Sequence, residues 1–272
     1  MDRNGFRNRN TRQWRGGALI ETEDRLATEE PLEIRLAGRR FTLTMRTPGH
    51  DEELAAGFLF AEGFINSRGE IAEIRRVRNA RGEPEPNAVD IVLNVPSADL
   101  RDRLQRNFVM SSSCGVCGKT SIESLTRRIQ PPSAGARVAV PVLVGLVRTM
   151  RESQRLFAMT GGIHAAALFE LDGNLQALRE DVGRHNAVDK LVGWALANSR
   201  LPLSRSILMV SGRASFEIVQ KAAAAGVPVL AAVSAPSSLA AELADELGVT
   251  LVGFVRDSGF NVYSHTGRII EG

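Results

Sequence analysis

The sequence is poor in cysteine, lysine and aromatic residues, and it has no long hydrophobic run. Two cysteines in 272 residues are too few for a disulfide scaffold, and a reactive thiol pair suits a reducing compartment, so we expect a cytoplasmic protein. The longest apolar run, Val138 to Val147, is too short to span a bilayer. We therefore expect no contact with a membrane.

Lysine is nearly absent, since the chain has 3 Lys and 31 Arg and a net charge of only +3. Nucleic-acid binding needs a concentrated basic surface, and only residues 1–17 form such a cluster. Those residues have almost no apolar content, which predicts a disordered basic tail, and no apolar segment follows them, so we expect no signal peptide. The composition therefore does not favour nucleic acid as a partner.

The remainder of the chain has the composition of a globular protein, with 43% hydrophobic and 24% charged residues. Alternating apolar residues and turn signals predict a smaller α+β part over residues 18–130. A Pro-Pro-Ser-Ala-Gly break then precedes a second part, residues 131–272, whose pattern is strand, strand, and three helix–strand pairs. Strands alternating with helices predict an α/β domain with a largely parallel sheet covered on both faces.

Both cysteines lie in one C-x-x-C motif, Cys114-Gly115-Val116-Cys117, followed by Lys119 and a predicted helix. The helix N-terminus and Lys119 favour the thiolate over the thiol, so the pair is a candidate nucleophile. The residues alone leave several interpretations open: a redox dithiol, half of a zinc site, a sulfur carrier that holds a persulfide, or an idle pair. A second C-x-x-C is missing, so we expect no metal site.

Two polar loops lie where helices follow strands in the second part. One reads Glu-Asp-Val-Gly-Arg-His-Asn at residues 180–186, and the other reads Ser-Gly-Arg-Ala-Ser at residues 211–215. Backbone N–H groups and arginines at the carboxyl ends of strands form a natural anion site. Two such loops in succession predict a phosphate-bearing ligand, with these candidate contacts: Arg184, His185, Gly212 and Arg213.

Five motifs occur together in one order along the chain. They are Ser-Cys-Gly-Val-Cys-Gly-Lys at 113–119, Thr-Gly-Gly-Ile-His-Ala-Ala at 160–166, Glu-Asp-Val-Gly-Arg-His-Asn-Ala-Val-Asp-Lys at 180–190, Ser-Gly-Arg-Ala-Ser at 211–215 and Phe-Asn-Val-Tyr at 260–263. In this combination the sequence resembles the FdhD family of formate dehydrogenase accessory sulfurtransferases. The resemblance covers about residues 20–270, and five motifs in order make chance an unlikely explanation.

The resemblance implies a specific activity. The family accepts sulfur from a cysteine desulfurase as a persulfide and passes it to the molybdenum cofactor, in its bis(molybdopterin guanine dinucleotide) form, before formate dehydrogenase receives that cofactor. Cys114 would be the persulfide cysteine, and Cys117 would be its helper or a second carrier. Arg184, Arg213 and Arg256 are candidates for the pyrophosphates. The implied cofactor-binding segment consists of Phe254, Val255, Arg256, Asp257, Ser258 and Gly259.

The fold implied by the resemblance is similar to that of cytidine deaminases, a three-layer α/β/α sheet. A zinc deaminase needs H-x-E at the first helix start and P-C-x-x-C at the next. This chain has Gly-Arg-His-Asn and Ser-Gly-Arg-Ala-Ser at those positions, so deamination is disfavoured. Two other functions remain open, a non-catalytic chaperone that binds the cofactor and a dithiol reductase. We also expect a homodimer.

Overall fold

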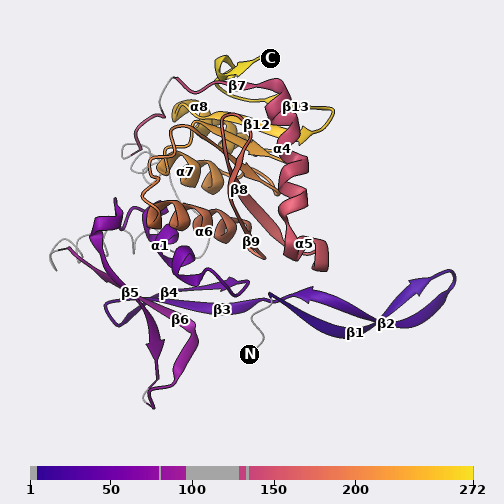
Figure 1. The fold of residues 1–272 in the computed structure, drawn as a ribbon, viewed down its shortest axis with the longest axis vertical. Coiled ribbons are helices and arrows are strands. Elements are labelled where there is room, and N and C mark those ends of the chain that lie inside the picture. The colour runs from indigo at the N-terminus through magenta and orange to yellow at the C-terminus, as the bar shows by residue number, and fades with distance from the viewer. Residues whose placement is uncertain (1–4, 80, 96–128, 133–134, 272) are drawn as a thin grey trace.

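The computed structural model describes residues 5–79, 81–95, 129–132 and 135–271. Cys114 and Cys117 lie outside these ranges, as do the loop and the helix predicted around them. The described residues form a six-stranded sheet, a four-stranded sheet, a short two-stranded sheet near the C-terminus and a narrow two-stranded arm that projects from the body (Figure 1). Among these residues, no helix is long and apolar enough to cross a bilayer.

The six-stranded sheet belongs to the second part of the chain and has the order β13-β12-β11-β10-β8-β9. Strands β10, β11 and β12 are parallel, whereas β8, β9 and β13 each run antiparallel to a neighbour. The prediction of a largely parallel sheet is therefore wrong, because tight turns join β8 to β9 and β12 to β13. The strands are β8 (His164–Glu170), β9 (Leu175–Asp181), β10 (Ser206–Val210), β11 (Val229–Ala232), β12 (Thr250–Arg256) and β13 (Gly259–Val262).

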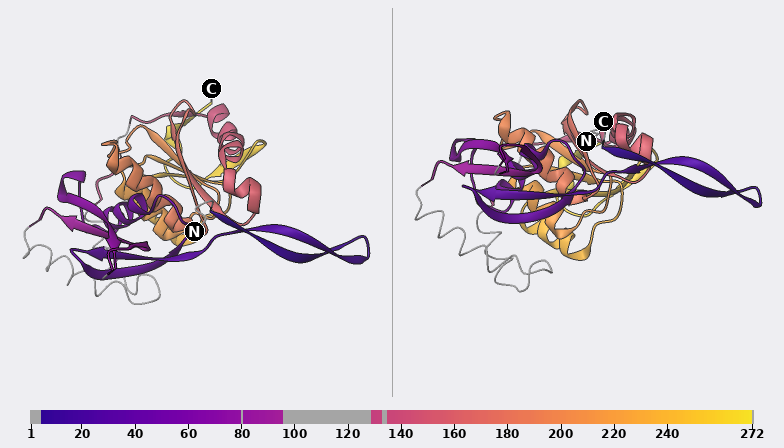
Figure 2. Two further views of the ribbon diagram at one scale, coloured as in Figure 1. Left: turned by 60° about the horizontal axis from the view of Figure 1, so that its bottom comes forward. Right: turned by 90° about the horizontal axis from the view of Figure 1, so that it is seen from below.

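Helices cover both faces of this sheet, as the sequence pattern predicts (Figure 2). Successive residues of a strand point to opposite faces, so Ala166 and Leu168 pack on the side of α6, α7 and α8, while Ala167 and Phe169 pack on the side of α4. The result is a three-layer α/β/α domain with one apolar core on each side of the sheet. The helices are α4 (Val140–Ser153), α5 (Arg155–Thr160), α6 (Arg184–Ala197), α7 (Phe216–Ala224) and α8 (Ser238–Glu246).

A separate four-stranded sheet with the order β4-β3-β6-β5, together with helix α1, forms a smaller α+β part. Leu32 and Ile34 of β3 pack with Leu54 of α1 in its core, and Leu196 of α6 belongs to the same cluster. The small part therefore shares its core with the large domain. Its elements are β3 (Glu30–Leu36), β4 (Arg39–Arg46), α1 (Asp51–Ala61), β5 (Ile71–Arg78), with the short helix η1 (Arg68–Glu70) before it, and β6 (Pro84–Leu93).

Helices α1 and α6 touch backbone to backbone at two glycines. A Cβ atom at Gly57 would lie 1.8 Å from the carbonyl oxygen of Asp189, and a Cβ at Gly193 would lie 1.8 Å from the carbonyl oxygen of Glu53. No side chain fits in either place, so glycine is required for this close approach. The contact fixes α6 against the small part along much of its length.

The prediction of a disordered tail over residues 1–17 is wrong for the described residues of that stretch. Strand β1 (Phe6–Arg15) pairs with β2 (Ala18–Ala27) in an antiparallel register of ten residue pairs. Gly16 and Gly17 form the turn, with φ values of 60° and 88°. Glycine adopts such positive φ angles without strain, and a two-residue hairpin turn of this kind matches the twist of the strands.

Helix α4 is shorter than predicted, since the sequence favours one helix over residues 142–159. The chain instead leaves the helical conformation at Gln154, where φ is −81° and ψ is 84°, and α5 begins at the next residue. Both side-chain oxygens of Glu180 accept hydrogen bonds from the first N–H groups of α5, at Leu156 and Phe157. These bonds compensate for the break. The remaining elements are β7 (Val138–Ala139), η2 (Thr266–Arg268) and β14 (Ile269–Ile270).

Candidate functional site

The two predicted polar loops and the loop after β11 meet at one edge of the large sheet, where parallel strands β10, β11 and β12 end. Ala214 forms a β-bridge with Pro236, and the Ser237 N–H donates to the Ala214 carbonyl at 3.1 Å. The Ser211 hydroxyl accepts a bond of 2.8 Å from the Ala165 N–H at the start of β8. The edge is therefore a continuous surface, at the position where α/β sheets bind ligands.

Asp181 organises the first loop from inside the protein. Its carboxylate accepts hydrogen bonds from the backbone N–H groups of Gly183 at 2.8 Å and Thr47 at 3.1 Å, and from the Asn186 side-chain amide at 3.1 Å. The Lys190 ammonium lies 2.7 Å from the same carboxylate, and both side chains are almost fully buried. This network holds the turn into α6 rigidly and joins it to the end of β4.

Arg184 is the first residue of α6, and its side chain lies over the second loop. A Cβ added to Gly212 would meet His164 Nδ1 at 3.3 Å and Arg184 Cδ at 3.8 Å, so Gly212 leaves room for both side chains. The Arg184 Nε atom is buried and has no hydrogen-bond partner in the part of the chain that the structure describes. The structure thus brings together two predicted site residues, Arg184 and Gly212, and places His164, which the sequence did not single out, beside them.

His164 is kept neutral by its surroundings. Burial lowers the pKa of its imidazole, and the positive charges of Arg184 and His185 lower that pKa further. An uncharged imidazole beside Arg184 has one nitrogen free to accept a proton or a hydrogen bond and leaves the arginine as the local cation.

His185 contacts the second loop through its Nε2 atom, which lies 3.2 Å from the Ser215 hydroxyl and 2.6 Å from a Glu217 carboxylate oxygen. This hydrogen bond from His185 is the main reason that the pKa of Glu217 is lowered, and burial only partly opposes it. Glu217 therefore stays ionised and holds the imidazole at the N-terminus of α7. Sequence reasoning missed Glu217, although its place in the first turn of a helix, two residues after Ser215, was a usable signal.

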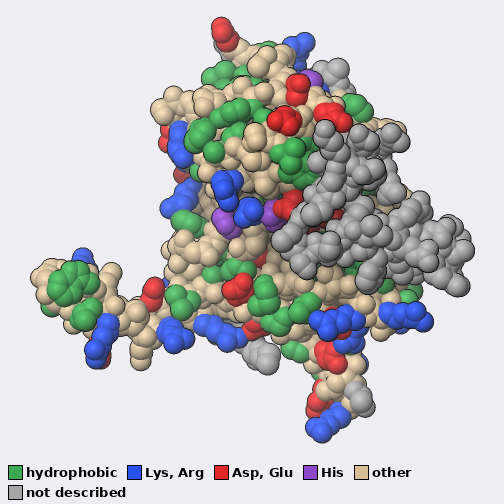
Figure 3. Space-filling view, turned by 180° about the vertical axis from the view of Figure 1, so that it is seen from behind, with side chains coloured by type: hydrophobic (Ala, Val, Ile, Leu, Met, Phe, Trp, Pro, Cys, Tyr) green, Lys and Arg blue, Asp and Glu red, His purple; other side chains and the backbone are tan. Residues whose placement is uncertain are grey.

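Arg213 is exposed, and together with Arg184 it adds two positive charges beside the carboxylate of Glu217, while the Asp181 carboxylate is paired with Lys190. Figure 3 shows histidine and basic side chains gathered in the middle of one face of the body. The N-termini of α6 and α7 add the positive ends of two helix dipoles. This combination of fixed cations and backbone N–H groups suits an anionic ligand.

The predicted cofactor-binding segment from Phe254 to Gly259 spans the turn of the β12–β13 hairpin. Only some of its side chains are exposed and therefore accessible to a ligand. Phe254 has a φ of 54° and is 44% exposed, whereas Val255 is fully buried in the core on the α4 side. Asp257 and Ser258 form the exposed turn, and the Arg256 guanidinium donates to the Val233 carbonyl.

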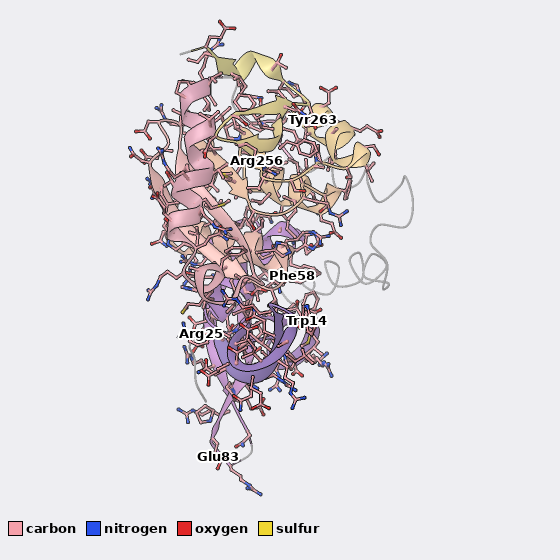
Figure 4. The ribbon with its side chains drawn as sticks, turned by 90° about the vertical axis from the view of Figure 1, so that its right-hand side faces the viewer. Trp14, Arg25, Phe58, Glu83, Arg256 and Tyr263 are labelled. Atoms are coloured by element: carbon pink, nitrogen blue, oxygen red, sulfur yellow. The ribbon has the colours of Figure 1, made fainter. Side chains whose placement is uncertain are left out.

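A close contact joins this hairpin to the loop edge. A Cβ at Gly253 would lie 2.9 Å from Pro236 and 3.0 Å from the ring of Tyr263. Figure 4 shows Tyr263 and Arg256 together in this upper part of the molecule. The sequence showed Tyr263 only as part of a motif, and no local pattern indicated its packing against Gly253 on the neighbouring strand.

Within the described ranges, no group of three or more His, Cys, Asp or Glu side chains could hold a metal ion. The candidate residues that the structure does bring together are Arg184, His185 and Gly212, with Arg213 on the same loop. Cys114 and Cys117 lie outside the described residues, so their position relative to this edge stays a prediction.

The fold and the loop edge define an α/β protein with a cationic, glycine-containing site at the carboxyl ends of its strands. Residues 27–270 match the model of the FdhD/NarQ family, and the chain belongs to that family. The match begins where the two-stranded arm ends.

Individual relatives support the same assignment. The chain is 53% identical to the sulfur carrier protein FdhD of Streptomyces coelicolor, over 94% of this chain and 92% of the relative. It is 50% identical to the sulfur carrier protein FdhD of Mycolicibacterium paratuberculosis, over 93% and 94% of the two chains. A crystal structure assigned to a formate dehydrogenase accessory protein from Desulfotalea psychrophila superposes with a TM-score of 0.76 at 28% identity, covering 97% of this chain and 99% of that one.

Proposed function

We propose that this protein is a sulfur carrier for the maturation of formate dehydrogenase. It accepts a sulfur atom from a cysteine desulfurase as a persulfide on Cys114 and transfers that sulfur to the bis(molybdopterin guanine dinucleotide) form of the molybdenum cofactor. The terminal sulfur of the persulfide is the transferred atom, the electron pair for its new bond comes from the acceptor, and the Cys114 thiolate leaves with the electrons of the broken S–S bond. The reducing cytoplasm keeps the resting cysteines as thiols.

One observation carries the proposal: a chain of the FdhD/NarQ family has its only two cysteines in a single C-x-x-C motif. The names of its relatives describe sulfur carriers, and a thiol is the group that such chemistry needs. The resemblance to cytidine deaminases belongs to this proposal as well: those enzymes bind a nucleoside, the zinc-ligand motifs are absent here, and we assign the guanine end of the cofactor to the same edge of the sheet.

The positive charge of the loop edge is complementary to the negative charge of the proposed cofactor. The cofactor has two pyrophosphate groups, and arginines that accept them in a bidentate manner are well suited to hold them. Arg184 and Arg213 lie on neighbouring loops at two helix N-termini, and Gly212 leaves room for the Arg184 side chain over the second loop. We therefore assign the pyrophosphates to this edge.

The persulfide step is tested by intact mass after incubation with a cysteine desulfurase and cysteine. We expect the wild type and Cys117→Ala to gain one sulfur atom and Cys114→Ala to gain none. We also expect Cys114→Ala to fold normally and to support no formate dehydrogenase activity. A fully active Cys114→Ala variant, or a wild type that gains no sulfur, would contradict the carrier role and favour a chaperone without sulfur chemistry.

The anion site is tested separately, with guanosine diphosphate as the probe. We expect Arg184→Ala to weaken its binding at least about tenfold, because hydrogen bonds to charged groups contribute about 1.5–3 kcal/mol. Isothermal titration calorimetry measures the Kd. Arg148→Ala is the matched control, since Arg148 is exposed on α4, on the opposite face of the sheet. Equal Kd values for the wild type and Arg184→Ala would exclude this edge as the phosphate site.

A further inference from the structure

Glu217 places a negative charge at an edge where the proposed ligand is an anion. Its partly exposed side chain lies in the first turn of α7, and one carboxylate oxygen is 2.6 Å from Nε2 of His185 on α6. A carboxylate beside a phosphate weakens binding, because like charges repel. The positive end of the α7 dipole explains an acidic residue in the first turn, but it does not explain the close contact with a residue of another helix. That contact therefore needs a separate reason.

The contact fixes where a hydrogen atom of the His185 imidazole lies. The pKa of Glu217 is lowered, chiefly by the hydrogen bond from His185, so the carboxylate is ionised at neutral pH. An ionised carboxylate only accepts hydrogen bonds, so Nε2 carries a hydrogen atom and donates it to Glu217. Nδ1 is then the nitrogen left for a ligand. It accepts a hydrogen bond from a hydroxyl when the ring is neutral and donates one to a phosphate when the ring is protonated.

The same contact keeps the hydroxyl of Ser215 away from its own helix. Ser215 is the N-cap of α7, yet its side chain makes no capping hydrogen bond, and its hydroxyl lies 3.2 Å from His185 Nε2. By contrast, Ser237 caps α8 by accepting a hydrogen bond from the Ala240 N–H. Because Nε2 carries a hydrogen atom, the Ser215 hydroxyl keeps its own hydrogen for another acceptor. The first N–H groups of α7 also have no side-chain cap, which suits phosphate binding.

A second ion pair lies one helical turn deeper between the same two helices. Lys221 of α7 donates to Asp189 Oδ2 on α6 at 3.1 Å and lies 2.8 Å from Oδ1, and both side chains are buried. Burial raises the pKa of Asp189 to about 6, while Lys221 and His185 oppose that shift. Such a buried pair contributes little net stability, because desolvation offsets the attraction, and its best-attested use is to set the register of the elements it joins.

We propose that Glu217 is a positioning residue for the anion site. It holds the His185 imidazole through Nε2–H and leaves Nδ1 and the Ser215 hydroxyl for the ligand. The Lys221–Asp189 pair in turn aligns α7 with α6 and so holds Glu217 in place. This inference rests on the proposed phosphate site at the loop edge, and it has an unusual consequence: removal of a negative charge beside an anion should weaken the binding of that anion.

Binding of guanosine diphosphate, measured by isothermal titration calorimetry, separates positioning from charge. We expect Glu217→Gln to raise the Kd about five- to tenfold, because the imidazole and the hydroxyl are no longer held for the ligand. A carboxylate that acted only through its charge would give the opposite sign, a lower Kd. In a His185→Ala background only the charge remains, so Glu217→Gln should then lower the Kd. Glu246→Gln is the control, since it removes an exposed charge at the far end of α8 and should leave the Kd unchanged.

The imidazole itself gives a readout that needs no ligand. The chain has only 4 His, so NMR of the imidazole nitrogens and their protons can resolve each ring. In the wild type the His185 Nε2–H proton should resonate downfield and exchange slowly with water, as a hydrogen bond to a carboxylate requires. In Glu217→Gln this proton should move upfield and exchange faster. An unchanged His185 signal would mean that Glu217 does not hold the ring and would overturn the proposal.

The deeper pair is tested by one variant that combines Asp189→Asn with Lys221→Met. This variant removes both buried charges, so neither is left without its partner, and the denaturation midpoint should stay close to that of the wild type. We expect its Kd for guanosine diphosphate to rise and its His185 signal to shift, because Glu217 has lost its alignment. Wild-type binding and a wild-type His185 signal in this variant would contradict a positioning role for the pair.

The Arg184→Ala variant separates a failure of this inference from a failure of the phosphate site. If Arg184→Ala weakens binding and Glu217→Gln tightens it, the phosphate site stands and the positioning role is overturned. Equal Kd values for the wild type and Arg184→Ala would overturn both.

Discussion

At the scale of single residues, Glu53 shows how burial and ion pairing compete. Its carboxylate lies 2.8 Å from Arg179 Nη2 and 3.2 Å from His50 Nδ1. Burial alone would raise the pKa of Glu53, but the hydrogen bonds from Arg179 and His50 outweigh it and lower that pKa to about 2. The ionised carboxylate on α1 is thus stabilised by a strand of the other sheet.

Glu53→Gln should therefore lower the free energy of unfolding at pH 7 by about 1–2 kcal/mol, after allowance for partial solvent screening. A lowered pKa stabilises the fold above the unfolded value of 4.5 and ceases to do so as the pH falls toward 2. The difference in the free energy of unfolding between Glu53→Gln and the wild type should therefore become smaller as the pH falls from 4.5 toward 2. Urea unfolding at pH 7, 4.5 and 3 measures it.

Glu52→Gln is the control for this prediction, because Glu52 is 50% exposed and 3.5 Å from Arg76. Its replacement should change the free energy of unfolding by less than about 0.5 kcal/mol at every pH. A pH-independent loss of stability in Glu53→Gln would mean that packing, rather than charge, explains its contribution.

The residues of the site were partly predictable, for a physical reason. Arg184, His185 and Gly212 follow strands directly, and the carboxyl ends of neighbouring strands meet in space, so chain position was enough to group them. Val255 was assigned to the ligand through its segment, but strand alternation turns its side chain into the core. The place of Glu217 in the first turn of α7 was a local signal, but its contact with His185 joins two loops that are distant in sequence.

At the scale of elements, the crossing of α1 and α6 is set by the two glycines described above. Gly57→Ala and Gly193→Ala should each lower the free energy of unfolding by about 3 kcal/mol or more, because a methyl group would overlap a backbone carbonyl that cannot move aside. Chemical denaturation measures the loss.

Gly145→Ala is the matched control, because it replaces a glycine in a helix that does not take part in the α1–α6 contact. Gly145 lies in α4, and a Cβ there would meet no atom within 4 Å. This variant should be more stable than the wild type by about 0.5–1 kcal/mol, because alanine favours the helix over glycine. Equal changes in the free energy of unfolding for all three variants would show that α1 and α6 can move apart without loss of stability.

Two element predictions failed for different reasons. Residues 1–17 were predicted to be disordered because they have almost no apolar content, although the Gly16-Gly17 pair is a hairpin signal. Helix α4 was extended through Gln154 because the apolar period continues there, while the break is compensated by Glu180, distant in sequence. In both cases a tertiary or cross-strand partner decided the conformation, and local composition does not reveal that partner.

At the scale of the whole molecule, the small part and the large domain are joined by the buried pair of Asp181 and Lys190. The Lys190 ammonium also donates to the Thr47 carbonyl at 2.8 Å, so the pair connects β4 to α6. Burial lowers the pKa of Lys190, and Asp181 opposes that shift. Removing the carboxylate leaves a buried ammonium without its counter-charge.

Asp181→Asn should therefore cost about 3–5 kcal/mol in the free energy of unfolding. Because the two parts share this network, circular dichroism and Trp194 fluorescence should report one common transition, shifted to lower denaturant. Asp245→Asn is the control, since the Asp245 side chain is 75% exposed, and it should leave the midpoint unchanged. Two separate transitions in the wild type would contradict a single cooperative unit.

The presence of Leu196 in the core of the small part bears on how the chain is made. Residues 30–93 leave the ribosome long before α6 is synthesised. The nascent small part therefore lacks Leu196 in its core and the α6 backbone at Gly193 against which α1 packs. The core of the small part therefore stays incomplete until roughly a hundred further residues have been synthesised. During that interval its apolar face is open to chaperones and proteases, and pulse proteolysis of stalled chains would detect the moment of closure.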